Sequence, residues 1–164
     1  NKGYDILLKI MGVTKTVQKF SHKQGIKDFV IKVNEQEMQT WENLYLNTTS
    51  ANATTKLLEK FYANKVLKKN STAYLYKLMV ETSRGLTWMK AGLPTNTELA
   101  HRTGISDTNS DNLRVALNDI GIIKPINNKP IILSIYLKNI TEEKTETEKV
   151  IADITKAVWN YYNK

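Results

Sequence analysis

Cysteine is absent from this chain of 164 residues, and proline and histidine are scarce, with three and two residues. The lack of cysteine excludes a disulfide framework and a thiolate metal site. No run of 18 apolar residues occurs, so no membrane-spanning helix is predicted. The first residues do not resemble a signal peptide, because lysines interrupt their short apolar runs. We therefore expect a cytoplasmic protein without membrane association, metal or cofactor.

Signatures of enzyme chemistry are also missing from the sequence. His22 and His101 are each isolated from a second histidine or a carboxylate at ligand spacing. No glycine-rich phosphate loop, nucleophile elbow or pair of catalytic carboxylates is recognisable. The sequence therefore predicts a protein that is not an enzyme.

Positive charge is abundant and unevenly distributed, with a net charge of +8. The first 33 residues hold seven lysines and two aspartates, and residues 122–140 add three lysines without an acidic residue. Such clusters favour a polyanionic partner, although a merely basic soluble protein is the alternative.

The first half of the chain reads as a hairpin followed by helices. β-branched and aromatic residues predict strands over residues 13–20 and 28–33. Apolar residues at helical spacing then predict helices from about residue 35 to 45, from 55 to 69, and from 71 to a stop at Gly85. We assign residues 1–53 to a basic N-terminal segment.

Two short helices with start and stop signals are predicted next. Thr95-Asn96-Thr97-Glu98 matches a capping box, and Gly104 would end the first helix. Ser106 or Thr108 would cap a second helix that ends at Gly121 and buries four apolar residues, Leu113, Ala116, Leu117 and Ile120. Two capped helices joined at a glycine form a helix-turn-helix. Residues 122–126 and 131–137 then predict a β-hairpin around the polar tip Asn127-Asn128-Lys129-Pro130.

The segment from about residue 71 to 138 resembles the winged helix-turn-helix domains of bacterial, plasmid and phage DNA-binding proteins. The resemblance rests on Gly104-Ile105-Ser106, followed seventeen residues later by Gly121-Ile122-Ile123. It implies an α+β, mainly α fold, with a winged helix-turn-helix over residues 54–138. Two features depart from the pattern, since Ser110 replaces an aliphatic anchor and Asp107, Asp111 and Asp119 make the recognition helix acidic.

The resemblance implies double-stranded DNA as the partner. Polar side chains of the second helix are chemically suited to base edges; they are Thr108, Asn109, Ser110, Asn112 and Arg114. The predicted β-hairpin would be the wing of such a domain. A second set of side chains is expected to contact DNA phosphates or to contact DNA from the wing: Thr95, Arg102, Ser106, Lys124 and Lys129. For each side chain an ordinary solvated surface role is the alternative.

A C-terminal helix is predicted from about residue 142 to 162, with acidic residues in its first turns as the helix dipole prefers. We assign residues 139–164 to this helix. Its apolar stripe has nearly heptad spacing and predicts a homodimer interface at Ile151, Ile154, Val158 and Tyr161. Packing of the stripe against the chain's own N-terminal helices is the alternative.

Together these features predict sequence-specific binding of double-stranded DNA by a transcriptional repressor or a plasmid or phage replication or segregation protein. Two alternatives stay open at this stage. The winged helix could bind a protein partner, or the lysine-rich N-terminal segment could bind nucleic acid without sequence preference.

Overall fold

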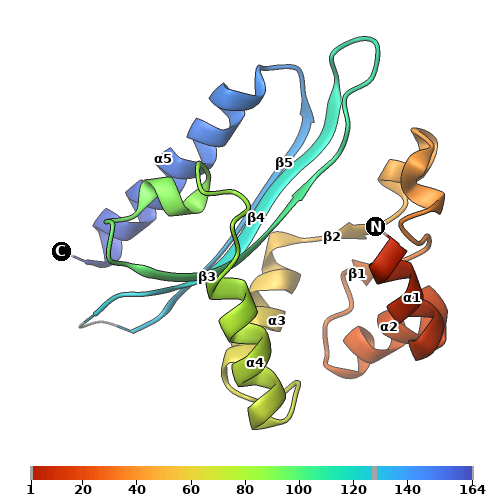
Figure 1. Ribbon diagram of the computed structural model, residues 1–164, viewed down its shortest axis with the longest axis horizontal. Coiled ribbons are helices and arrows are strands. Elements are labelled where there is room, and N and C mark those ends of the chain that lie inside the picture. The colour runs from red at the N-terminus through yellow and green to blue at the C-terminus, as the bar shows by residue number, and fades with distance from the viewer. Residues whose placement is uncertain (1, 127–128, 164) are drawn as a thin grey trace. The chain divides into compact units, whose positions relative to one another are not determined.

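The computed structural model describes residues 2–126 and 129–163, and the chain divides into two compact units, residues 1–57 and 58–164 (Figure 1). Among the described helices, none is both long and apolar enough to cross a membrane.

The first unit is mostly helical. It contains α1 (Lys2–Met11), α2 (Val13–Lys23), the two-residue strands β1 (Phe29–Val30) and β2 (Thr48–Thr49), and the start of α3 (Ala51–Tyr62). The predicted strand over residues 13–20 is wrong, because this segment lies within α2. Val13, Val17 and Ser21 are spaced by four residues and share one helix face, where the Ser21 hydroxyl donates to the Val17 carbonyl.

The segment predicted as a helix from residue 35 to 45 forms two short 3₁₀ turns, η1 (Glu37–Gln39) and η2 (Glu42–Tyr45). Side chains hold the first backbone N–H groups of this segment. The Asp5 carboxylate accepts hydrogen bonds from the N–H groups of Glu35 and Gln36, at 2.9 and 3.0 Å. Asp5 lies 30 residues before Glu35, so the local sequence pattern does not show this contact.

The second unit is built around an antiparallel sheet in the order β3–β4–β5. The strands are β3 (Glu98–Ile105), β4 (Arg114–Lys124) and β5 (Ile131–Ile140). The 3₁₀ helix η3 (Met89–Gly92) and α5 (Lys144–Tyr162) cover one face, and the end of α3 with α4 (Lys69–Val80) covers the other (Figure 1).

Residues along each strand alternate between two hydrophobic cores, because successive strand side chains point to opposite faces. Leu99 is paired with Ile123 in the core under α5, and Ala100 is paired with Ile122 in the core under α3 and α4. All four side chains are buried. Burial on both faces therefore fixes the register of the sheet, since a one-residue shift would exchange the two cores.

The predicted winged helix-turn-helix is wrong, and so is the mainly helical fold class. The segment predicted as the first helix of the helix-turn-helix is β3, and the predicted second helix, the recognition helix, is a turn followed by β4. Leu113, Ala116, Leu117 and Ile120 have helical spacing in sequence, but burial along β4 alternates with a period of two. Tertiary burial on two faces overrides the local helical signals.

The signals that predicted the helix ends have other roles. The Glu98 carboxylate accepts a hydrogen bond from the Tyr76 hydroxyl at 2.9 Å and lies 3.4 Å from Lys124 Nζ. Gly104 lies within β3, and Gly121 lies within β4, where a Cβ atom would be 2.9 Å from His101 Cβ. The predicted hairpin is present as the end of β4 and β5, with Ile122 opposite Ile132. Its predicted tip includes residues 127 and 128, which lie outside the described part of the chain.

The predicted C-terminal helix is confirmed as α5. Ile151, one residue of the predicted dimer interface, has no exposed surface and packs in the core beneath the sheet of its own chain. Its assignment to an interface is therefore wrong. Ile154 and Tyr161 are exposed, and Val158 is half-buried.

Replacement of Gly92 by alanine is expected to destabilise the second unit. A Cβ atom at Gly92 would lie 2.2 Å from the backbone oxygen of Ala152 in α5. Because backbone cannot move as a side chain can, we expect Gly92→Ala to lower the free energy of unfolding by about 2–3 kcal/mol. Urea unfolding of the protein expressed from its complete gene measures this change. Gly104→Ala is the control, because nothing lies within 4 Å of its Cβ position; equal effects of the two substitutions would contradict the prediction.

Candidate functional site

The outer strand of the described sheet, β3, presents a polar segment, Arg102-Thr103-Gly104. Arg102 is exposed, Thr103 is half-buried, and open space surrounds the position where Gly104 would carry a Cβ atom. The segment therefore offers a guanidinium, a hydroxyl and unobstructed backbone at one edge of the unit. Such a combination is suited to binding an anionic group.

The loop between α4 and η3 contacts this strand on both faces. On the face of α4, the Thr82 hydroxyl oxygen accepts hydrogen bonds from Arg102 Nη1 at 3.4 Å and from the Arg84 N–H at 3.3 Å. On the other face, Gly85 approaches so closely that a Cβ atom would lie 2.4 Å from Thr103 Cγ2. Gly85 has φ +69°, a conformation that glycine adopts without a steric penalty. The loop therefore wraps around the edge strand.

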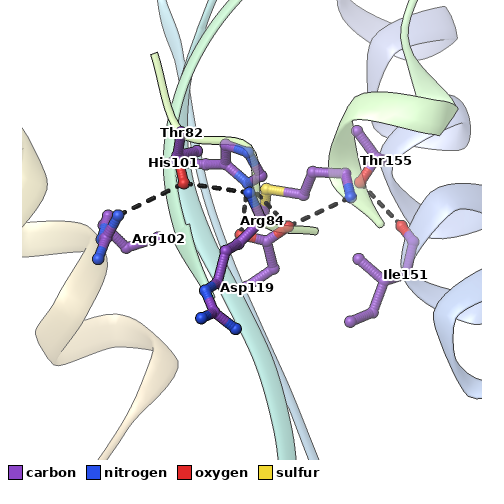
Figure 2. Close-up of polar contacts among 8 residues, drawn as sticks. Thr82, Arg84, His101, Arg102, Asp119, Ile151 and Thr155 are labelled. Carbon is purple, nitrogen blue, oxygen red and sulfur yellow. Dashed lines mark hydrogen bonds and ion pairs between the residues drawn. The ribbon is translucent and has the colours of Figure 1, made fainter. Parts of the chain in front are cut away.

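A buried ionisable pair is formed by His101, which precedes Arg102 in the sequence, and Asp119 on the neighbouring strand. His101 Nδ1 donates to both carboxylate oxygens of Asp119 in β4, at 3.0 and 3.1 Å, and the Met89 N–H donates to the same carboxylate at 3.2 Å (Figure 2). Asp119 has no exposed surface and His101 is 2% exposed. Burial raises the pKa of Asp119 above its ordinary value, against the lowering effect of the hydrogen bonds from His101 and Met89.

A second carboxylate anchors the same region to α5. Glu148 is 12% exposed; it accepts a 2.7 Å hydrogen bond from the Thr87 hydroxyl and lies 3.4 Å from Lys144 Nζ. Partial burial alone would raise the pKa of Glu148. The hydrogen bonds from Thr87, Trp88 and Lys144 outweigh burial and hold that pKa below its ordinary value.

The residues predicted to contact base edges lie in the turn between β3 and β4, except Arg114, which begins β4. The Asn109 side chain accepts the N–H groups of Asp111 and Leu113, and the Asn112 amide donates to the Thr141 carbonyl. Thr108 forms a bridge with Arg114, whose guanidinium donates to the Ser106 carbonyl. Ser110 is exposed. These side chains shape a hairpin turn, and the helix on which they were placed does not exist.

The residues predicted to contact phosphate are spread over the second unit. Ser106 begins the same turn, where its hydroxyl oxygen accepts the N–H groups of Val115 and Ala116. Thr95 lies in the turn before β3, Lys124 ends β4, and Lys129 is exposed between β4 and β5. Of this set, only Arg102 belongs to the polar edge segment.

In the first unit, residues 31–47 form a loop whose ends meet through the pairing of β1 and β2, as in an Ω-loop. Asn47 closes it: Asn47 Oδ1 accepts the N–H groups of Lys32 and Val33. Asn34 and Glu37 bind each other reciprocally through side chain and backbone, at 2.8 and 2.9 Å. The half-buried Glu35 lies between them in the sequence, and its backbone N–H is held by Asp5.

Burial, and negative charges near this loop, raise the pKa of Tyr4 on α1. Burial raises the pKa of the Tyr4 hydroxyl, and the negative charges of Glu35 and Asp5 raise it further. The Glu35 carboxylate therefore lies near an aromatic hydroxyl that keeps its proton. Within the described ranges, no three histidine, aspartate or glutamate side chains are grouped so that they could hold a metal ion.

Comparisons with known proteins give a consistent result. A sequence model of the beta-lactamase enzyme family matches residues 1–162. The chain is 41% identical to beta-lactamase VEB-1 of Pseudomonas aeruginosa over 99% of the chain and 55% of that protein. It is 30% identical to extended-spectrum beta-lactamase PER-1 of the same species over 98% of the chain and 52% of that protein.

Solved structures agree with the sequence comparisons. The TLA-1 extended-spectrum beta-lactamase is 44% identical, with a TM-score of 0.98 over 100% of this chain and 60% of that one. A class A beta-lactamase of Bacteroides cellulosilyticus is 26% identical, with a TM-score of 0.93 over 97% of this chain and 57% of that one. The chain thus spans about half the length of the curated relatives it matches.

The lowered pKa of Glu148 predicts a contribution to acid sensitivity. The unfolded chain protonates this carboxyl near its ordinary pKa of 4.5, whereas the folded protein does so only at lower pH. The stability from ionised Glu148 is therefore present above the unfolded pKa and is lost as the pH falls through the folded pKa. We expect Glu148→Gln to reduce the fall in melting temperature between about pH 5 and pH 3. Melting curves across this range test it, with the exposed Asp153→Asn as the control; identical pH slopes for wild type and Glu148→Gln would refute the prediction.

Proposed function

The chain belongs to the beta-lactamase enzyme family, and on that premise we propose that the complete protein hydrolyses the four-membered amide ring of β-lactam antibiotics. The observation that carries the proposal is the 41% identity to beta-lactamase VEB-1 over 99% of the chain. Because the chain spans about half of that relative, the proposal concerns the protein expressed from its complete gene.

Family membership corrects the sequence-based interpretation of function. The prediction that the protein is not an enzyme is wrong, and so is the prediction of double-stranded DNA as its partner. The two alternatives, a protein-interaction module and a nonspecific nucleic-acid binder, gain no support from the relatives either. Without DNA as the partner, the residues predicted to contact bases and phosphates have no such ligand to bind. The cytoplasmic location stays a prediction.

The polar edge segment matches one of the motifs of this family. Class A beta-lactamases and penicillin-binding proteins carry S-x-x-K, S-D-N and K-T-G motifs. Arg102-Thr103-Gly104 corresponds to K-T-G, with arginine in place of lysine. β-Lactam antibiotics carry a carboxylate, and a guanidinium can bind one with two parallel hydrogen bonds. We assign Arg102 and the Thr103 hydroxyl to binding that carboxylate, and Gly104 to leaving the strand edge open.

Of the other two motifs, S-x-x-K does not occur in this sequence and S-D-N occurs only in a turn. No S-x-x-K occurs in the 164 residues, so the serine nucleophile is not among them. A literal S-D-N does occur, at Ser110-Asp111-Asn112, but it lies in the β3–β4 turn. There the Asn112 amide is bound to the Thr141 carbonyl, and Asn112 has φ +58°. This triplet is therefore a turn sequence, and we give it no part in the reaction.

A glutamate is the accepted base for deacylation in class A enzymes, where it activates a water that attacks the acyl-enzyme. The loop over residues 31–47 holds two glutamates, Glu35 and Glu37. Glu37 is exposed, and its carboxylate is used to hold the Asn34 N–H. Glu35 is half-buried on a backbone position fixed by Asp5. We assign the deacylation base to Glu35.

Removal of the Arg102 guanidinium is expected to weaken substrate binding. For Arg102→Ala we expect KM for nitrocefin to rise roughly 10- to 100-fold, corresponding to about 1.5–3 kcal/mol for hydrogen bonds to a charged group. Arg102→Lys, which recreates the family motif, should retain most of the activity. Steady-state kinetics measure both variants. Lys77→Ala, which removes an exposed cation paired with Glu81 on α4, is the control; an unchanged KM in Arg102→Ala would refute the assignment.

Removal of the Glu35 carboxylate is expected to trap the acyl-enzyme. We expect Glu35→Gln to release a burst of one product equivalent from nitrocefin and then to turn over slowly, because acylation proceeds while deacylation lacks its base. Mass spectrometry of the intact protein should show the covalent adduct. Glu37→Gln is the matched control on the same loop. Steady turnover by Glu35→Gln at the wild-type rate would exclude Glu35 as the base.

A further inference from the structure

Asp119 contacts three parts of the second unit, and none of these contacts is used in the proposed reaction. Its carboxylate accepts hydrogen bonds from His101 on β3, from the Met89 N–H at the start of η3, and from the Ile120 N–H on its own strand. It has no exposed surface and lies on the sheet face covered by α5. We propose that Asp119 is a positioning residue, which holds Arg102-Thr103-Gly104 and the loop over residues 82–88 in place through His101 and Met89.

A single peptide bond joins His101 of the buried pair to Arg102 of the polar edge segment. His101 precedes Arg102, so a shift of the imidazole moves the backbone from which the guanidinium projects. The Met89 N–H fixes the far end of the loop that carries Thr82 and Gly85. Thr82 binds the Arg102 guanidinium, and Gly85 lies against Thr103. One carboxylate therefore holds both the strand and the loop that wraps around it.

Close packing alone does not explain why an ionisable pair, and not two apolar residues, occupies positions 101 and 119. An ionised carboxylate in an apolar core loses its hydration, and a well-packed pair of apolar residues often supports a fold as well as a buried ion pair does. Leu117 and Ile123 occupy the same face of β4 and are fully buried without polar partners. What apolar residues could not supply at position 119 is an acceptor for donors on two other elements. The directional bonds to His101 and Met89 are therefore the specific contribution of Asp119.

This inference rests on the proposed function only for its kinetic consequence. If Arg102 and Thr103 bind the carboxylate of the substrate, their displacement raises KM more than it lowers kcat, because the interaction is present before the chemical step. The mobility of β3 is a property of the protein alone and can be measured without substrate. The two measurements therefore separate a failure of this inference from a failure of the proposed function.

Three variants of the protein expressed from its complete gene test the inference. Asp119→Asn keeps the shape of the side chain but not its charge or its second acceptor. The double variant His101→Leu with Asp119→Leu replaces both partners by apolar groups and leaves no charge unpaired. Thr155→Val is the matched control, because the Thr155 hydroxyl is equally buried in the unit and donates within α5, to the Ile151 carbonyl at 2.8 Å (Figure 2).

Hydrogen exchange measured by mass spectrometry is the first readout, with residues 131–140 of β5 as the internal reference. We expect residues 98–105 to exchange about tenfold faster relative to that reference in Asp119→Asn and in the double variant, and at the wild-type ratio in Thr155→Val. Nitrocefin kinetics are the second readout, where KM should rise roughly tenfold in the same two variants with a smaller change in kcat.

The outcomes are distinct. Wild-type exchange of β3 in Asp119→Asn overturns the inference, whatever the kinetics show. Recovery of wild-type KM and exchange by the double variant also overturns it, because packing would then suffice. If the wild-type protein does not hydrolyse nitrocefin, the proposed function fails and the exchange measurement alone decides. Faster β3 exchange in both Asp119 variants, with Thr155→Val unchanged, supports the positioning role.

Discussion

Burial of both faces of the β3–β4–β5 sheet is the constraint on which the second unit depends. One face is covered by η3 and α5 and the other by α3 and α4, so every strand must supply apolar residues in alternation to two separate cores. A shift of one residue would place each core residue on the wrong side. The register that results, with Leu99 opposite Ile123, also places Arg102 on the face of the sheet covered by α4 and Thr103 on the face covered by α5.

The pair of His101 and Asp119 is the exception within this arrangement. Both residues occupy positions where alternation calls for an apolar side chain, and both are buried. Polar residues in such positions are usual at functional sites, where local stability is sacrificed for geometry. Here they lie beside Arg102-Thr103-Gly104, the segment that corresponds to the K-T-G motif. A buried carboxylate, an edge strand and a loop that wraps around it thus form one continuous polar structure in an otherwise apolar unit.

The same pair explains why the local pattern between residues 95 and 121 predicts helices where the structure has strands. The buried face of β4 reads Val115, Leu117, Asp119, Gly121, Ile123, and that of β3 includes His101 and Thr103. With polar residues and glycine at inward positions, no period of two is visible in either strand. The remaining apolar residues then fit helical spacing, and Thr95 with Glu98 supplies a capping box that the fold does not use. The H-R-T-G segment was visible throughout, but with arginine instead of lysine, and without the S-x-x-K serine, it did not indicate a catalytic motif.

The sequence by itself determined the elements whose apolar pattern is uninterrupted. α5 follows from its helical spacing, β5 from the alternation of its apolar residues, and the end of β4 from the apolar pair Ile122 and Ile123. The path of β3, the pairing that brings His101 to Asp119, and the contact of Thr82 with Arg102 were decided only by tertiary structure. The partners in these contacts lie 18 and 20 residues apart, and nothing local records that they meet. A local pattern shows which residues are suited to burial, whereas a polar site in the core is stable only once its distant hydrogen-bond partners have arrived.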